Sequence, residues 1–156
     1  MRKKNLSAEA KCARNSVCGI RAIFLVNENF PLLFPRFSMK IISWNVRGLN
    51  GLTKKRMMKR KIQQDKLVVL FIQETKCSSE TLQMFMEKIW KGCKTTAIDA
   101  KGTKGEVAIA WNLAIIYLRD SSACAHAISA SFHILGSNIH GHLLNIYSPQ
   151  PLELKL

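Results

Sequence analysis

The apolar and polar positions divide the chain at about residue 39. Residues 1–38 show no sustained period, whereas an ordered pattern of apolar runs and turns begins at Met39. We therefore place a basic, poorly patterned N-terminal extension at 1–38, one domain at 39–150 and a short tail at 151–156. A length of 156 residues favours one domain over two independent ones.

Two apolar runs of strand length each end in polar residues. Met39–Trp44 predicts a short buried strand, so Asn45 is expected at its carboxyl end, in a turn that contains two glycines. Leu67–Ile72 is unbroken, which is typical of a strand covered on both faces, and Glu74 closely follows its end.

Two helices are expected beside these strands. Thr53 can cap a helix that extends to about Gln64, with three apolar anchors at Leu52, Met58 and Ile62. Ser78 or Ser79 can cap a second helix, and its apolar residues follow the i, i+3, i+4, i+7 spacing of a core-facing stripe: Leu82, Phe85, Met86 and Ile89.

From Lys94 onward the pattern shortens to that of strands. After a turn at 101–105, alternation over 106–111 predicts a strand, and more are expected at 114–118, 127–135 and 139–147. The turn 136–138 is suited to a hairpin. Two strand–helix units followed by a strand meander predict a mixed α/β or α+β domain.

Charge adds a class of partner to this picture. The net charge is +14, and residues 40–66 alone carry nine basic residues and one acidic residue. Such an excess favours a polyanionic partner, which could be nucleic acid or an anionic membrane surface. Arg47 and the cations of the first helix are candidate phosphate contacts, namely Lys54, Lys55, Lys59 and Arg60; the alternative is a merely solvated helix face.

Other residue types exclude several classes of protein. The 47% hydrophobic content disfavours wholesale disorder, and no run reaches the roughly 20 apolar residues of a spanning helix. The five cysteines lack paired C-x-x-C spacing, so neither a disulfide framework nor a zinc knuckle is indicated. His140 and His142 share one face of a predicted strand, but no third metal ligand is evident.

An ordered series of short motifs resembles the endonuclease/exonuclease/phosphatase superfamily. The series comprises Ser43-Trp44-Asn45-Val46-Arg47-Gly48-Leu49, Gln73-Glu74-Thr75-Lys76, Trp111-Asn112 and Tyr147-Ser148-Pro149. Over about 39–150 it is most similar to the endonuclease domain of plant-type non-LTR retrotransposons. The resemblance implies the N-terminal portion of a two-sheet, four-layer α/β sandwich and a metal-dependent hydrolase that cleaves DNA in the nucleus.

The resemblance also implies roles for three residues. Glu74 would be a ligand of Mg²⁺ or Mn²⁺, because hard cations prefer oxygen ligands and stabilise charge that develops on phosphate. Asn45 would lie beside the metal or the scissile phosphate, and Tyr147 would approach the phosphate through its hydroxyl. Both would position the substrate rather than act as bases.

Several departures from the family pattern bear on activity. Arg47 stands where the family usually has Asp, Glu106 where it often has Gly, and Ser148 where plant elements usually have Gly. The family continues to Gly-Asp-x-Asn and Ser-Asp-His motifs, which supply the base and further ligands, and this chain ends before them. We therefore expect a truncated domain, weakly active or inactive, whose second sheet would come from the missing half.

Two hypotheses of different classes remain open. One is a DNA endonuclease; the other is a non-catalytic, transposon-derived remnant that at most binds nucleic acid through its basic helix. A phosphatase for small phosphoesters or inositol lipids is a more distant third. An uncovered sheet edge would favour self-association, and no membrane partner is expected.

Overall fold

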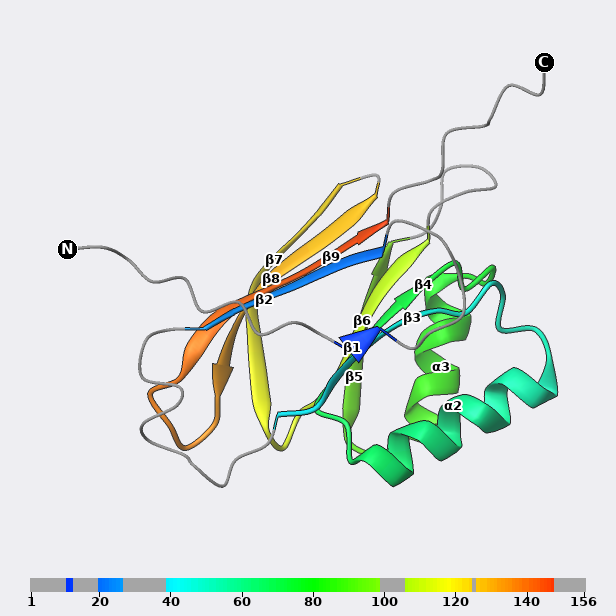
Figure 1. The fold of residues 1–156 in the computed structure, drawn as a ribbon, viewed down its shortest axis with the longest axis horizontal. Coiled ribbons are helices and arrows are strands. Elements are labelled where there is room, and N and C mark those ends of the chain that lie inside the picture. The colour runs from blue at the N-terminus through cyan, green and yellow to red at the C-terminus, as the bar shows by residue number, and fades with distance from the viewer. Residues whose placement is uncertain (1–10, 13–19, 27–38, 99–105, 125, 148–156) are drawn as a thin grey trace, which may run out of the picture.

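Two β-sheets pack face to face, and two helices cover the outer face of one of them (Figure 1). The computed structural model describes residues 11–12, 20–26, 39–98, 106–124 and 126–147. The first sheet has the order β1-β3-β4-β6-β5, with bounds Lys11–Cys12, Ile41–Asn45, Val69–Gln73, Val107–Asn112 and Cys93–Ile98. The second has the order β2-β9-β8-β7, with bounds Ile20–Val26, His140–Tyr147, Ala127–Ile134 and Ile116–Cys124. The two-sheet α/β architecture expected from the sequence is confirmed.

Strand β4 lies at the centre of the first sheet and is buried along its whole length. It pairs with β3 in parallel and with β6 antiparallel, so its polar carboxyl end lies beside that of β3. One side of β4 contributes Phe71 to the core between the sheets, and the other contributes Leu70 and Ile72 to the core beneath the helices. Coverage of this strand on both faces is thus confirmed.

Helices α2, Leu52–Asp65, and α3, Ser79–Ile89, form the outer layer. Ser78 caps α3 as predicted, since its hydroxyl accepts a hydrogen bond of 3.2 Å from the Thr81 amide. The predicted cap of α2 is wrong: the N-cap is Gly51, in extended conformation and without a side-chain cap bond. Leu52 is 71% exposed instead of anchoring the helix. The two other predicted anchors, Met58 and Ile62, are buried.

The second sheet is built from this chain itself. Strand β2 pairs antiparallel with β9 over seven residues, although the sequence predicted no element within 1–38. Strands β7, β8 and β9 form the predicted meander, and the Ile134 amide donates to the Ile139 carbonyl across the 136–138 turn. The expectation that a missing half supplies the second sheet is therefore wrong. The predicted turn at 101–105 lies outside the described residues.

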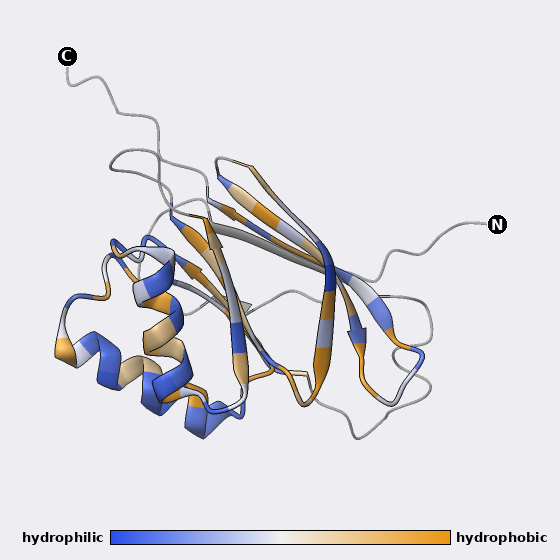
Figure 2. Ribbon diagram, turned by 180° about the vertical axis from the view of Figure 1, so that it is seen from behind, coloured by the Kyte–Doolittle hydropathy of each residue, from blue (hydrophilic) through white to orange (hydrophobic). Residues whose placement is uncertain are grey.

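A cluster of buried apolar residues lies between the two sheets. Hydrophilic residues make up much of α2 (Figure 2). Strand β8 shows the alternation most clearly, because Ile128, Ala130, Phe132 and Ile134 are buried and the residues between them are not. Such alternation is typical of a strand with one face on the core. Within the described part of the chain, no helix is long and apolar enough to cross a membrane.

Candidate active site

The candidate site is the pair Asn45 and Glu74, at the carboxyl ends of β3 and β4. The parallel register places Asn45 opposite Gln73, so Glu74 is the next residue beyond the paired strands. The Asn45 side-chain amide donates a hydrogen bond of 3.0 Å to the Glu74 carboxylate. Backbone bonds continue the pairing past the strand ends: the amides of Val46, Gly48 and Leu49 donate to the carbonyls of Gln73, Glu74 and Thr75. The structure thus brings together two of the residues singled out in the sequence.

Backbone conformation around this pair is strained. Arg47, Glu74 and Lys76 all have positive φ, at 47°, 55° and 54°. A non-glycine residue in such a conformation costs on the order of 1–3 kcal/mol and persists only where its surroundings impose it. Three such residues lie in two adjacent loops at this end of the sheet, and two more, Lys66 and Asp120, lie elsewhere in the described part of the chain. Because strain of this kind clusters at active sites, the three around this pair support the choice of this end of the sheet as the candidate site.

A second carboxylate, Glu106, holds the Glu74 loop in place. The Thr75 hydroxyl donates a 2.6 Å hydrogen bond to the Glu106 carboxylate, which also accepts from the backbone amide of Lys76. The Glu74 amide donates to the Glu106 carbonyl at 2.9 Å. The sequence marked Glu106 only as a departure at a position that is often Gly; its role as the acceptor for this loop was missed.

Lys54 joins the first turn of α2 to the Asn45 loop. Its ammonium donates 2.9 Å hydrogen bonds to the carbonyls of Val46 and Arg47. The Arg47 amide in turn donates to the Asn45 side-chain oxygen at 3.1 Å, and the Arg47 side chain is exposed. Two of the candidate phosphate contacts therefore lie directly beside the site.

The other candidate phosphate contacts lie further along α2. The Lys55 ammonium sits 5.5 Å from the centre of the Phe85 ring, in a cation–π contact with α3. Lys59 and Arg60 are exposed in the middle of the helix. Lys59 lines a pocket beside α3, whereas Arg60 lines another pocket beside β3, so the cations of α2 lie on more than one side of the helix.

Tyr147 ends β9 at the same end of the sandwich as Glu74. Gln73, which precedes Glu74, links the two strand ends, because its side chain donates a hydrogen bond of 3.2 Å to the Ile146 carbonyl. Tyr147 is 9% exposed and belongs to the core between the sheets, and the centres of its ring and the His126 ring are 6.5 Å apart. Tyr147 is thus close to the site, and its ring is anchored in the core.

A buried amide pair behind the site was missed in the sequence. The Gln73 side-chain amide donates a 2.7 Å hydrogen bond to Asn145, which itself donates to the carbonyls of Ala108 and Ile72 at 2.9 and 3.3 Å. Both side chains are 0% exposed. The pair links β4 to β9 next to Glu74. Its only sequence signal is a polar residue in each of two apolar strands.

A single carboxylate at this site, that of Glu74, would suit a magnesium ion that keeps most of its water. Glu74 offers its second carboxylate oxygen, whereas the side-chain oxygen of Asn45 already accepts from Arg47. Mg²⁺ is commonly held by one or two carboxylates with several waters retained. Among the described residues, no group of three or more His, Cys, Asp or Glu side chains could hold a metal ion. The pair His140 and His142 on β9 is therefore not joined by a third ligand from these residues.

Comparison with solved structures supports the fold. The catalytic domain of human Nocturnin, solved with a bound sulfate anion, matches with a TM-score of 0.51 and 15% identity, over 64% of this chain. Two endonuclease/exonuclease/phosphatase family proteins, from Bacteroides thetaiotaomicron and Bacteroides vulgatus, match with TM-scores of 0.49 and 14% identity, over 65% and 64% of this chain. The chain covers 45%, 46% and 50% of these three chains, about half of their length. No protein-family model and no curated protein matches the sequence.

Proposed function

We propose that the protein is a weakly active, metal-dependent phosphodiester hydrolase that cleaves DNA, of the kind found in plant-type non-LTR retrotransposons. The observation that carries the proposal is the Asn45–Glu74 pair, held on strained backbone at the ends of two paired parallel strands. A two-sheet α/β fold similar to that of the Nocturnin catalytic domain supports it, as does the ordered motif series in the sequence.

Each residue of the site has its own role in the proposed hydrolysis. Glu74 would hold Mg²⁺ or Mn²⁺, which supplies stabilisation of the charge that develops on the phosphate. Asn45 fixes the orientation of the Glu74 carboxylate and presents its amide beside the scissile group. Tyr147 would donate its hydroxyl hydrogen to a phosphate oxygen. Glu106, Thr75 and Lys54 keep the two loops in position.

Charge around the site suits a polynucleotide better than a small phosphoester. Arg47 and Lys54 lie beside the site, and the cations of α2 continue away from it along the helix. Several cations near one site can contact several phosphates of a nucleic-acid strand, whereas a small phosphoester presents only one phosphate. We infer DNA as the substrate, and the resemblance to retrotransposon endonucleases implies a nuclear location.

Cleavage of supercoiled plasmid tests the proposal. Nicking to open circle is expected with Mg²⁺, and it should be lost with EDTA and in Glu74→Gln, which keeps the size of the side chain while removing its charge. Glu80→Gln, at an exposed position in the first turn of α3, is the matched control and should nick like wild type. Equal nicking by Glu74→Gln would refute the assigned role, and no nicking by folded wild type would refute the activity.

One observation favours a second candidate, a nucleic-acid-binding protein without hydrolysis. Glu106 is already engaged by Thr75 and Lys76, and the described residues provide no further acidic or histidine cluster to complete a metal centre. A general base typically contributes about 10² to 10⁴ in rate. This candidate predicts salt-sensitive DNA binding that EDTA leaves unchanged, measured by fluorescence anisotropy.

A further inference from the structure

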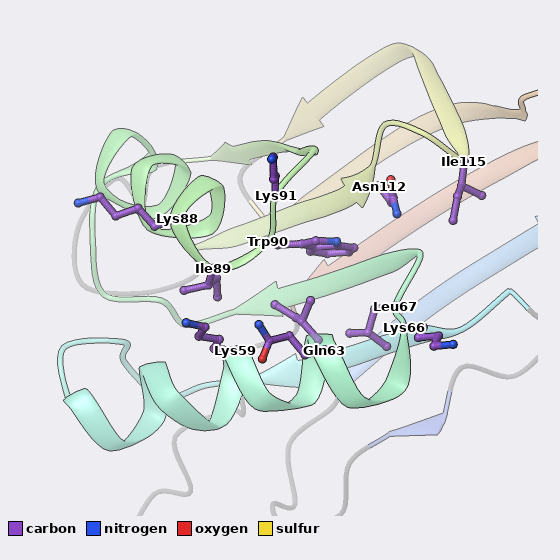
Figure 3. A pocket seen from close by; sticks show the side chains of 11 residues that line it. Lys59, Gln63, Lys66, Leu67, Lys88, Ile89, Trp90, Lys91, Asn112 and Ile115 are labelled. Carbon is purple, nitrogen blue, oxygen red and sulfur yellow. The ribbon is translucent and has the colours of Figure 1, made fainter.

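A lysine-rimmed pocket lies at the end of the first sheet opposite the candidate active site (Figure 3). It is enclosed by the C-terminal turns of α2 and α3 and by the segment that follows β6, and its volume is about 420 Å³. Leu67, which enters β4, lines it, whereas Glu74 follows the other end of that strand. The five residues of β4, which span roughly 17 Å, lie between the two places.

The lining of this pocket is strongly cationic. Four lysines contribute to it, Lys59, Lys66, Lys88 and Lys91, and none of its lining residues is acidic. The C-termini of α2 and α3 each present about half a negative charge, so helix ends offset about one of the four positive charges. Nearby Asp65 forms an ion pair of 2.6 Å with Lys61 and does not line the pocket. All four lysines are exposed, and the net positive charge of the lining favours an anionic ligand.

Apolar and amide groups form the rest of the wall. Leu67, Ile89, Trp90 and Ile115 supply its apolar surface, and the Trp90 ring lies between the Lys91 and Leu67 side chains in Figure 3. Asn112 uses its side-chain oxygen to accept from the Ala114 amide at 2.9 Å. That bond directs the Asn112 nitrogen, a donor, to the remaining side of the group. The pocket therefore combines cations and a donor with an apolar wall.

We propose that this pocket binds a nucleotide unit, with its phosphate among the lysines and its base against the apolar wall. Phosphate satisfies the excess positive charge, and a flat base offers both an apolar face and polar edges for Asn112. The volume lies within the 300–1,000 Å³ typical of small-molecule sites. The same chemistry is offered by a free nucleotide and by one nucleotide of a strand that follows α2 from the candidate active site.

Amide chemical shifts, measured by NMR on the full chain in EDTA, test this site without any hydrolysis. Thymidine monophosphate is expected to shift the signals of residues 88–91 and 112–115 in a saturable way, and inorganic phosphate to bind at least about tenfold more weakly, because it lacks the base. Shifts absent from these segments, or phosphate that binds as tightly as the nucleotide, would overturn the proposal.

Charge reversal supplies the matched comparison. Lys88→Glu/Lys91→Glu should weaken thymidine monophosphate by about tenfold or more, whereas Lys94→Glu/Arg119→Glu, with the same change in net charge at exposed positions outside the pocket, should leave it nearly unchanged. If both double variants weaken thymidine monophosphate binding equally, the effect comes from net charge alone, and the proposed site in the pocket is contradicted.

A titration with a second ligand shows whether the pocket takes a free nucleotide or one nucleotide of a strand. If a strand supplies it, an oligothymidylate will shift the same residues at much lower concentration and will add shifts along α2. If a free nucleotide supplies it, the monophosphate will bind the pocket at least as tightly. Repeating the titration with Glu74→Gln keeps the two proposals apart, since loss of nicking leaves binding at this pocket unchanged.

Discussion

Gln73 and Asn145 join the two sheets through a side-chain hydrogen bond of 2.7 Å that is closed to solvent. Asn145 makes two further bonds to carbonyls of the first sheet, so one amide satisfies three buried partners. Removing one member of such a set leaves the others desolvated and unpaired, which costs about 1–3 kcal/mol in addition to any cavity.

Asn145→Ala is therefore expected to lower the free energy of unfolding by about 3 kcal/mol. The exposed amide of Gln83, which bonds only to Glu87 on its own helix, provides the control, and Gln83→Ala should cost less than about 0.5 kcal/mol. Urea unfolding followed by circular dichroism measures both. Equal losses would show that the buried pair adds no stability.

Asn45→Ala should reduce the rate of DNA nicking by about 10² to 10³, because it frees the Glu74 carboxylate and removes the polar group that we propose contacts the phosphate. Asn50→Ala, an exposed residue in the same turn, should nick at the wild-type rate. The comparison uses single-turnover plasmid nicking. An unchanged rate for Asn45→Ala would exclude a positioning role for this amide.

Glu106→Ala removes the acceptor of the Thr75 hydroxyl and the Lys76 amide. We expect a loss of about 2 kcal/mol in the free energy of unfolding and faster hydrogen exchange of the Lys76 amide. The exposed Glu87→Ala serves as the control and should leave that exchange rate unchanged. Unaltered Lys76 exchange in Glu106→Ala would show that another group holds the loop.

Gly48 has a φ of +91°, and an added Cβ would meet the Lys76 side chain at 3.4 Å. Gly48→Ala should thus destabilise the protein by about 1–2 kcal/mol. Gly51 has nothing within 4 Å of such a Cβ and caps α2, so Gly51→Ser should be neutral or stabilising by a few tenths of a kcal/mol. Thermal unfolding of both variants checks the contrast; equal melting temperatures would contradict it.

The pKa of the Cys93 thiol is raised above its ordinary value of 9.0, first by burial and then by the Glu87 carboxylate. The unfolded chain therefore loses this proton at a lower pH than the folded protein does. The protonated thiol therefore contributes stability that is fully present below about pH 9. Above that pH the free energy of unfolding falls by up to about 1.4 kcal/mol per pH unit. Unfolding free energies at pH 8 and 10 should fall more for wild type than for Cys93→Ala; equal falls would contradict the shift.

Much of the fold could be predicted because the relevant signals are local. The unbroken apolar run of β4 and the Ser78 cap of α3 depend on adjacent residues, and both predictions are confirmed. Strand β2 was missed because it forms by pairing with β9, which is more than a hundred residues away in the sequence. Leu52 was misassigned as an anchor because α2 begins one residue earlier than its predicted cap.

In the candidate site, too, local features could be predicted and contacts between distant segments could not. Asn45 and Glu74 could be placed at strand ends from periodicity alone, and parallel pairing brings them together. The roles of Glu106, Gln73 and Asn145 depend on contacts between distant segments, which carry no periodic signal in the sequence. The positive φ of Glu74 is likewise imposed by its surroundings, and the residue itself gives no indication of it.

The backbone bonds that join the Asn45 and Glu74 loops have a consequence for the order of folding. All of them lie within residues 46–75, a continuous strand–helix–strand segment, whereas the Gln73–Asn145 bond spans 72 positions. Contacts close in sequence incur less loop-closure entropy and form sooner. We therefore expect the Asn45–Glu74 pair to assemble early, before the second sheet docks onto the first.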